Sequence, residues 1–168
     1  MTQKEYKKSF TPISLCTDKG FVDFLIKVYP ENDQYPESGI VSRHLGKLEQ
    51  GDYMKVSGPK ISITYLGNGN FQFRKKNDLV KKYNELFFVC GGTGIAPYYN
   101  IIKHIEQEVD NGLPHNFQKI TLLYCNKTDN DILLYEEIEK LREKLDFLDV
   151  QYFVKKQLGD VFLENQQR

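Results

Sequence analysis

The sequence has little cysteine and no excess of either charge. Its 168 residues carry 23 basic and 23 acidic side chains, so no long-range field favours nucleic acid or an anionic membrane. Cys16, Cys90 and Cys125 are odd in number and widely spaced. This pattern argues against a disulfide framework or a metal site, and it predicts free, buried thiols in a reducing intracellular compartment.

Long apolar runs are also lacking. No stretch approaches the roughly 20 apolar residues of a membrane-spanning helix, and the start MTQKEYKKSF lacks the apolar core of a secretory signal. We therefore expect no transmembrane segment, no nucleic-acid partner and no metal. The expected compartment is cytoplasmic or mitochondrial, with membrane association only through a partner.

The most informative segment is residues 87–97, FFVCGGTGIAP, in which an apolar run breaks into three glycines and then restarts as an amphipathic pattern. It predicts a strand, a tight turn and a helix with Pro97 in its first turn. Glycines at a strand end let the backbone approach a ligand, and the helix directs unpaired N–H groups there. This arrangement is typical of nucleotide-phosphate binding. The spacing does not match G-x-G-x-x-G, so a turn that binds nothing is the alternative.

The second half of the chain alternates between strand and helix patterns. Apolar residues recur at helical spacing after the first strand and again after the second. The predicted elements are strands at 87–90, 120–125 and 150–154, and helices with apolar positions at 98–109 and 134–145. Such alternation predicts a parallel sheet with its ligand at the carboxyl ends of the strands, where residues 91–94 and 126–131 meet.

The first half reads as β structure, rich in Phe, Tyr, Val and Ile between turn residues. The strand candidates are 21–29, 52–56, 61–66 and 71–73. The charged stretch from residue 74 fits a linker or a solvated loop. We expect two lobes: a partial antiparallel β-barrel at 1–73, a linker at 74–86, and a truncated α/β domain at 87–168.

Short motifs along the chain match one known family in the right order. They are Phe10-Thr11-Pro12, FVDFLIKVY at 21–29, YPESGIVS at 35–42, Gly58-Pro59 with YLGNGNF at 65–71, the glycine turn, and NKTDNDILL with Glu136-Glu137-Ile138. The chain thus resembles the ferredoxin-NADP-reductase superfamily, and within it the cytochrome b5 reductases. The resemblance implies a flavin-binding barrel and a nicotinamide-binding lobe. The activity that the resemblance implies is hydride transfer from NADH or NADPH to FAD, followed by electron transfer to a haem protein.

The resemblance also assigns roles. Thr11 takes the catalytic position beside the flavin ring, Phe10 packs against the ring system, and Lys8 stands where an arginine neutralises the flavin pyrophosphate. Lysine lacks arginine's bidentate fork, and Ile40 replaces a polar residue. The remaining implied cofactor-binding residues are Pro12, Lys27, Tyr29, Gly39, Val41, Ser42, Gly91, Gly92, Thr93, Gly94, Asn126 and Asp131.

Two features leave the function open. Lys155 falls near the position where these reductases carry an NADH-selecting aspartate; a lysine there either tolerates a 2′-phosphate or is unused. The family also has barrel strands before its flavin signature and a Cys-Gly-Pro-Pro motif after the third parallel strand, which this sequence lacks. We expect protein partners to cover the open barrel and sheet edges. The alternative functions are a degenerate, non-catalytic structural or assembly subunit of a larger, respiratory complex, or a fragment of a longer enzyme.

Overall fold

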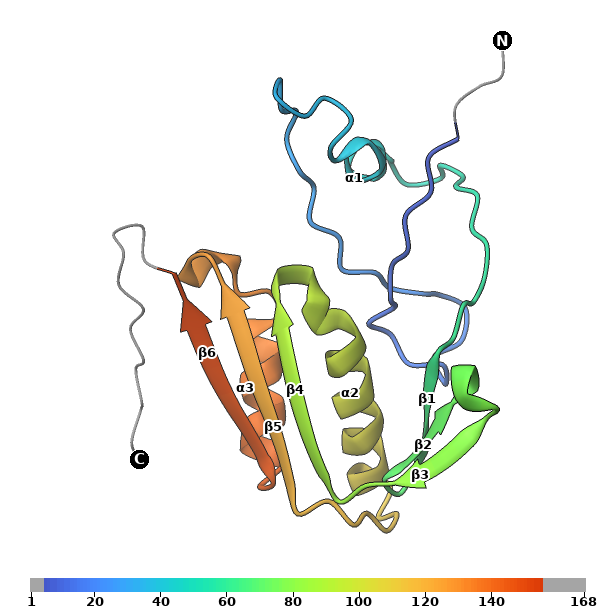
Figure 1. Cartoon of the computed structure of the whole chain (residues 1–168), viewed down its shortest axis with the longest axis vertical. Helices are drawn as coiled ribbons and strands as arrows, with labels where there is room; N and C mark the ends of the chain where they lie inside the picture. Colours follow the sequence, from blue (N-terminus) through green and yellow to red (C-terminus); the bar gives the residue numbers. More distant parts are fainter. Residues whose placement is uncertain (1–4, 156–168) are drawn as a thin grey trace.

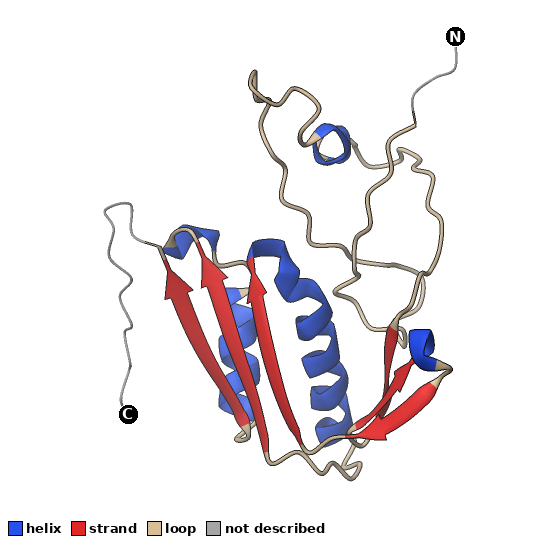
Figure 2. Cartoon of the chain, in the orientation of Figure 1, coloured by secondary structure: helices blue, strands red, loops and turns tan. Residues whose placement is uncertain are grey.

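The computed structural model describes residues 5–155, which form an antiparallel sheet followed by a parallel sheet with two helices (Figure 1). A long irregular segment with one short helix precedes both sheets (Figure 2). In chain order the elements are α1 (Ile40–Leu45), β1 (Ile63–Gly67), β2 (Asn70–Phe73), η1 (Arg74–Lys76), β3 (Leu79–Lys82), β4 (Glu85–Gly91), η2 (Gly92–Ile95), α2 (Ala96–Asp110), β5 (Lys119–Asn126), η3 (Asp129–Asp131), α3 (Tyr135–Lys144) and β6 (Leu148–Val154).

The parallel sheet confirms the strand and helix alternation predicted for the second half. Its order is β4-β5-β6, with Gly91 opposite Cys125 and Asn126 opposite Val154. Both helices cover the same face, because their buried side chains join those of alternate strand residues in one core. The core residues of this lobe include Phe88, Ile102, Ile105, Ile120, Leu122, Tyr124, Ile138, Leu141 and Val150.

The antiparallel sheet packs beside the C-terminal half of α2. Strands β1, β2 and β3 pair in sequence order, and the tight β1–β2 turn requires a glycine at 69. Gly69 has a φ of +74°, and a Cβ there would lie 2.3 Å from the carbonyl oxygen of Tyr83. Aromatic rings of Tyr65, Phe71 and Phe117 then join this sheet to the main core.

Several sequence expectations for the first half are wrong. Residues 21–29 and 52–56 form no strand; their one ladder contact is an isolated bridge between Pro12 and Phe24. A strand needs a neighbouring backbone to pair with, and β-forming residues alone do not supply one. The barrel is accordingly open, as expected, and the three-stranded sheet is the part of it that forms β-strands.

The charged stretch at 74–86 contains more structure than a linker. Strand β3 lies inside this stretch and pairs with β2, so its four residues, two of which are lysines, extend the antiparallel sheet. The domain boundaries at 1–73, 74–86 and 87–168 stay a prediction. The cysteines are free, but the expectation that they are buried is wrong for Cys16 and Cys125, which are exposed. No helix within residues 5–155 is long and apolar enough to cross a membrane.

Candidate functional site

The glycine turn lies at the carboxyl end of β4 and leads directly into α2. Gly91 ends the strand, residues 92–95 form one 3₁₀ turn, and the helix begins at Ala96 with Pro97 in its first turn. Gly92 has a φ of +51°, and a Cβ added there would meet nothing within 4 Å. The backbone at Gly92 is therefore open to an approaching ligand, which is the property that the sequence predicts for this turn.

A buried tyrosine connects this turn to the segment after β5. The Tyr124 hydroxyl donates to the carbonyl oxygen of Gly92 at 2.9 Å and accepts from the Leu133 N–H at 3.3 Å. Burial raises the pKa of Tyr124, so the hydroxyl keeps its proton for this bond. Sequence reasoning placed Tyr124 only in a buried strand; the signal for its role was a polar atom on an otherwise apolar strand face, which requires a partner.

Asn126 presents an unused donor at the same edge. It is the last residue of β5, and its side-chain Nδ2 is buried without a hydrogen-bond partner of good geometry among the described residues. A buried amide donor without a partner costs free energy unless something else accepts from it. The position therefore suits a ligand acceptor atom beside the glycine turn, and the cofactor-binding role of Asn126 stays a prediction.

Lys27 and Asp131 bring the two halves of the predicted site together. The Lys27 ammonium contacts Asp131 Oδ1 at 2.6 Å, although the residues are 104 positions apart. Asp131 also accepts from the Thr128 hydroxyl at 2.9 Å. The hydrogen bonds from Lys27 and Thr128 lower the pKa of Asp131, and the bond to Asp131 raises the pKa of Lys27. Both groups are therefore charged at neutral pH.

Residues 35–42, which match the family's loop around the flavin pyrophosphate, are held in place by hydrogen bonds from their own and neighbouring side chains. The buried Ser42 hydroxyl donates to the Gly39 carbonyl oxygen at 3.0 Å and accepts from the Tyr29 N–H at 3.3 Å. Arg43 donates to the carbonyl oxygens of Ser38 and Pro36 at 2.5 and 3.2 Å. These bonds fix the loop shape, and Ile40 and Val41 follow as the first residues of α1.

The flavin signature lies in an exposed segment. Lys8 and Thr11 are exposed, and Phe10 and Pro12 are half-buried. Within the described chain no hydrogen bond joins Lys8 or Thr11 to the glycine turn, so the structure brings together Lys27, Asp131, Asn126 and the turn, but not the flavin signature.

The residues just after the signature are attached to α2. Asn100 donates to the Ser14 carbonyl oxygen at 2.7 Å, and the Cys16 sulfur lies 3.8 Å from His104 Nε2. These contacts hold residues 14–16 alongside α2, the helix that follows the glycine turn.

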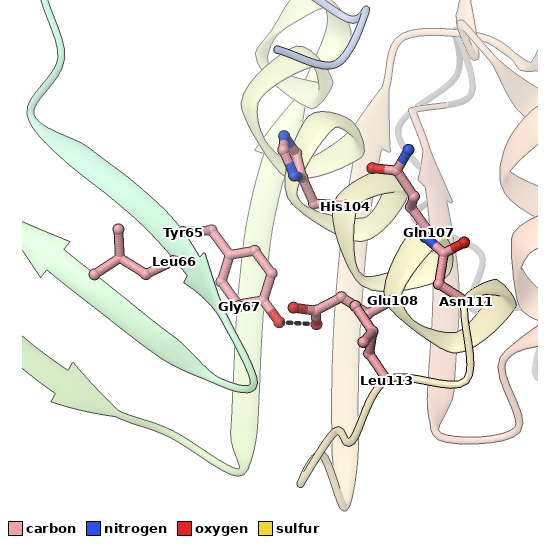
Figure 3. Close-up of a pocket in the computed structure, with 8 residues that line it drawn as sticks. All are labelled: Tyr65, Leu66, Gly67, His104, Gln107, Glu108, Asn111 and Leu113. Carbon is pink, nitrogen blue, oxygen red and sulfur yellow. Dashed lines mark hydrogen bonds between the residues drawn. The ribbon is translucent and has the colours of Figure 1, made fainter. Parts of the chain in front are cut away.

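A cavity of about 230 Å³ lies elsewhere, between β1 and the C-terminal half of α2 (Figure 3). Glu108 crosses it, accepting from the Tyr65 hydroxyl at 2.5 Å and from the Asn68 N–H at 3.0 Å. The glycine turn precedes the other end of α2, so this cavity is no part of the candidate site.

Comparison with known proteins supports the assignment of both halves. Residues 1–65 match the oxidoreductase FAD-binding domain, and residues 88–162 match the oxidoreductase NAD-binding domain. Chicken NADH-cytochrome b5 reductase 2 is 35% identical over 142 residues, covering 82% of this chain and 45% of that protein. The NADPH nitrate reductase of Phytophthora infestans is 37% identical over 140 residues, covering 81% of this chain and 15% of the relative.

Solved structures agree with these matches. The cytochrome b5 reductase domain of Ulva prolifera nitrate reductase superimposes with a TM-score of 0.77 at 30% identity, covering 91% of this chain and 55% of that domain. The CS-b5R domains of human Ncb5or, in the NAD+ form, give 0.61 at 28% identity, covering 90% of this chain and 39% of that one. A Plasmodium falciparum ferredoxin-NADP+ reductase variant shares the fold at 0.59 and 18% identity, covering 91% of this chain and 54% of that one.

Fold and motifs together define a flavin- and nicotinamide-binding type of oxidoreductase, in which the FAD-binding part precedes the NAD-binding part. Within this class the chain is a homologue of the cytochrome b5 reductases, and it shares the fold of ferredoxin-NADP+ reductase. It spans less than half the length of the two curated relatives described above.

Proposed function

We propose that this chain takes part in flavin-dependent oxidation of NADH or NADPH, with electrons passing on to a haem protein, as the name of the chicken relative suggests. The observation that carries the proposal is the open backbone at Gly92, together with the buried Asn126 amide, which makes no hydrogen bond of good geometry among the described residues. Both lie at the carboxyl edge of a parallel sheet, which is where such folds bind dinucleotides.

The described residues fit the two cofactors to different degrees. On the nicotinamide side, residues 91–94 offer backbone without side-chain obstruction, apart from Thr93, whose hydroxyl can hydrogen-bond the dinucleotide. On the flavin side, Phe10 offers an apolar face, Thr11 a hydroxyl, Lys8 a positive charge, and residues 39–42 a braced loop. When bound, FAD supplies the chemistry of accepting a hydride and releasing electrons singly.

The chain's own residues would then bind and orient. Thr11 would hydrogen-bond the flavin ring edge, Lys8 would offset the negative charge of the flavin phosphates, and Asn126 would donate to the dinucleotide. The Tyr124 hydroxyl keeps the Gly92 carbonyl turned toward the protein interior, which leaves the opposite side of the turn for the ligand. Water exclusion and orientation are the protein's contribution in this class of reaction.

An absorption spectrum tests this proposal. The purified chain is mixed with FAD, freed of unbound cofactor, and titrated with NADH or NADPH under anaerobic conditions. We expect a retained flavin band that either nucleotide bleaches, and we expect Thr11→Val to slow the bleaching at least tenfold. Thr121→Val, on the uncovered face of β5, is the matched control. A chain that stays colourless after FAD addition would contradict the proposal.

The exposed apolar side chains of the first half favour a second candidate, a non-catalytic structural or assembly role in a larger complex. Tyr53 is 98% exposed and Val56 is 75% exposed, and both lie in the irregular segment before β1. Contiguous exposed apolar surface marks interaction sites. A chain that binds no flavin but forms a stable complex with a co-purified protein would support this role against the enzymatic one.

A further inference from the structure

The Lys27–Asp131 ion pair joins the segment that carries the flavin loop to the connection after β5. Lys27 lies two residues before Tyr29, whose N–H donates to Ser42 at the end of the braced loop, residues 39–42. Asp131 ends the 3₁₀ turn that follows β5. The pair therefore links the two regions assigned to the two cofactors, although neither residue belongs to a motif that requires the other.

Asp131 is held firmly from its own side. Its Oδ2 accepts from the Thr128 hydroxyl, and its N–H donates to the Thr128 carbonyl oxygen at 3.1 Å. Two residues later, the Leu133 N–H donates to the Tyr124 hydroxyl that also bonds Gly92. Lys27 is thus connected to the glycine turn through Asp131, the two backbone steps to Leu133, and the Tyr124 hydroxyl.

Further polar contacts between the described part of the first segment and the α/β part lie along α2. They involve Ser14, Cys16 and Thr17 with Asn100, His104 and Gln107. These contacts hold residues 14–17 against α2 but do not involve the loop at 39–42. The 24–29 segment is held by the Lys27 ion pair and by Leu25, whose side chain packs against the hydrophobic core.

We propose that Asp131 is a positioning residue that acts through Lys27, and that this ion pair is a latch holding the flavin-loop segment against the carboxyl edge of the parallel sheet. The reaction consequence rests on the proposed function: a loosened latch would lengthen the distance that a hydride must cross. Hydride transfer is steeply sensitive to such misplacement. The latch itself is independent of whether any cofactor binds.

Hydrogen exchange of the full chain tests the latch without any activity. We expect Asp131→Asn to accelerate amide exchange at least fivefold in peptides covering 24–29 and 126–133, and the charge-swapped Lys27→Asp/Asp131→Lys chain to restore protection to at least one of them. Asp149→Asn is the matched control, because Asp149 pairs with Lys119 at 3.7 Å within the sheet. Unchanged exchange in Asp131→Asn, or no recovery in the swapped chain, would overturn the proposal.

Zero-length coupling of carboxylates to amines adds a direct readout of the contact. We expect an amide cross-link between Lys27 and Asp131 that disappears in Asp131→Asn. A Lys119–Asp149 cross-link without a Lys27–Asp131 cross-link would overturn the latch.

Flavin reduction tests the consequence for the reaction. We expect Asp131→Asn to lower its limiting rate about tenfold. An unchanged rate would overturn the positioning role. A chain that is not reduced at all would contradict the proposed function instead, while exchange and coupling still decide whether the latch exists.

Discussion

Single polar atoms decide the geometry of the candidate site. Tyr124 places its hydroxyl between the Gly92 carbonyl oxygen and the Leu133 N–H. The amide donor of Asn126 makes no hydrogen bond of good geometry to the residues that the structure describes. Neither feature changes the hydrophobic pattern of β5. Sequence reasoning identified the glycines and named Lys27 and Asp131 separately, because residue types indicate chemistry. It could not pair them, because a contact across 104 residues depends on how the lobes are placed.

Gly92 is the residue at which an added methyl group separates ligand binding from folding. Its φ of +51° disfavours any side chain, so we expect Gly92→Ala to lower the free energy of unfolding by about 1 kcal/mol. No protein atom lies within 4 Å of the new Cβ, which projects into the open approach to the turn. We expect nucleotide affinity, measured by calorimetry with ADP-ribose, to fall more than tenfold.

Gly112 provides the control for this substitution. It has a φ of +62°, a similarly unobstructed Cβ position, and lies just beyond the C-terminal end of α2. Gly112→Ala should cost similar stability and leave ADP-ribose binding intact. Equal losses of binding in both variants would show that the glycine turn is not the nucleotide site.

Lys155 is expected to set the preference between the two nucleotides. Its N–H donates to the Asn126 carbonyl oxygen at 3.1 Å, so the residue lies beside the candidate site. An ammonium there attracts a 2′-phosphate, whereas a carboxylate repels it and accepts from a ribose hydroxyl. We expect Lys155→Asp to shift the NADH-to-NADPH ratio of kcat/KM toward NADH at least tenfold. Lys127→Asp, an exposed change nearby in sequence, should shift it less.

At the scale of elements, the α/β part was predictable, whereas in the first part the strands predicted at 61–66 and 71–73 are confirmed by β1 and β2 and those at 21–29 and 52–56 are wrong. Helix α2 carries its own apolar stripe and ends at Asp110, just before Asn111-Gly112. Strand β5 lies between two partner strands, so local pattern and tertiary contacts agree. Residues 21–29 have the same strand-forming composition, but only Phe24 finds a bridge partner. Strand β3 shows the opposite case: four exposed residues, including two lysines, form a strand because β2 is available to pair with them.

The contact between the antiparallel sheet and α2 should depend on pH. Burial, followed by the hydrogen bond to Glu108, raises the pKa of Tyr65 well above its ordinary value of about 10. The neutral phenol is therefore favoured in the folded state. The stability that it contributes is complete below about pH 10 and is lost as the pH rises from there toward the folded-state pKa.

Urea unfolding between about pH 8 and pH 11 checks this expectation. The midpoint should fall with rising pH in the unmutated chain, and Tyr65→Phe should flatten the part of the curve due to this group. Tyr53→Phe, at a side chain that is 98% exposed, should leave the curve unchanged. A curve that is the same for all three chains would contradict the role assigned to Tyr65.

At the scale of the whole molecule, the two faces of the parallel sheet are unequal. The helices cover the face that carries Phe88, whereas Phe87 and Val89 on the opposite face are 66% and 54% exposed. Parallel sheets are ordinarily covered on both faces. The described chain therefore presents one apolar sheet face as well as the exposed side chains of its first segment.

Replacing side chains on each face of the parallel sheet should distinguish exposed apolar surface, measured by dye binding, from the contribution of each face to stability. We expect Phe87→Ser/Val89→Thr to reduce binding of a hydrophobic dye by half or more, and to change the free energy of unfolding by less than about 1 kcal/mol, because these side chains contribute little to the core. Phe88→Ala, one residue away on the covered face, should cost about 3–5 kcal/mol. Dye fluorescence and urea unfolding on the same samples measure both effects. If Phe87→Ser/Val89→Thr destabilised the chain as strongly as Phe88→Ala, the open face would be buried in solution, by self-association or by the rest of the chain.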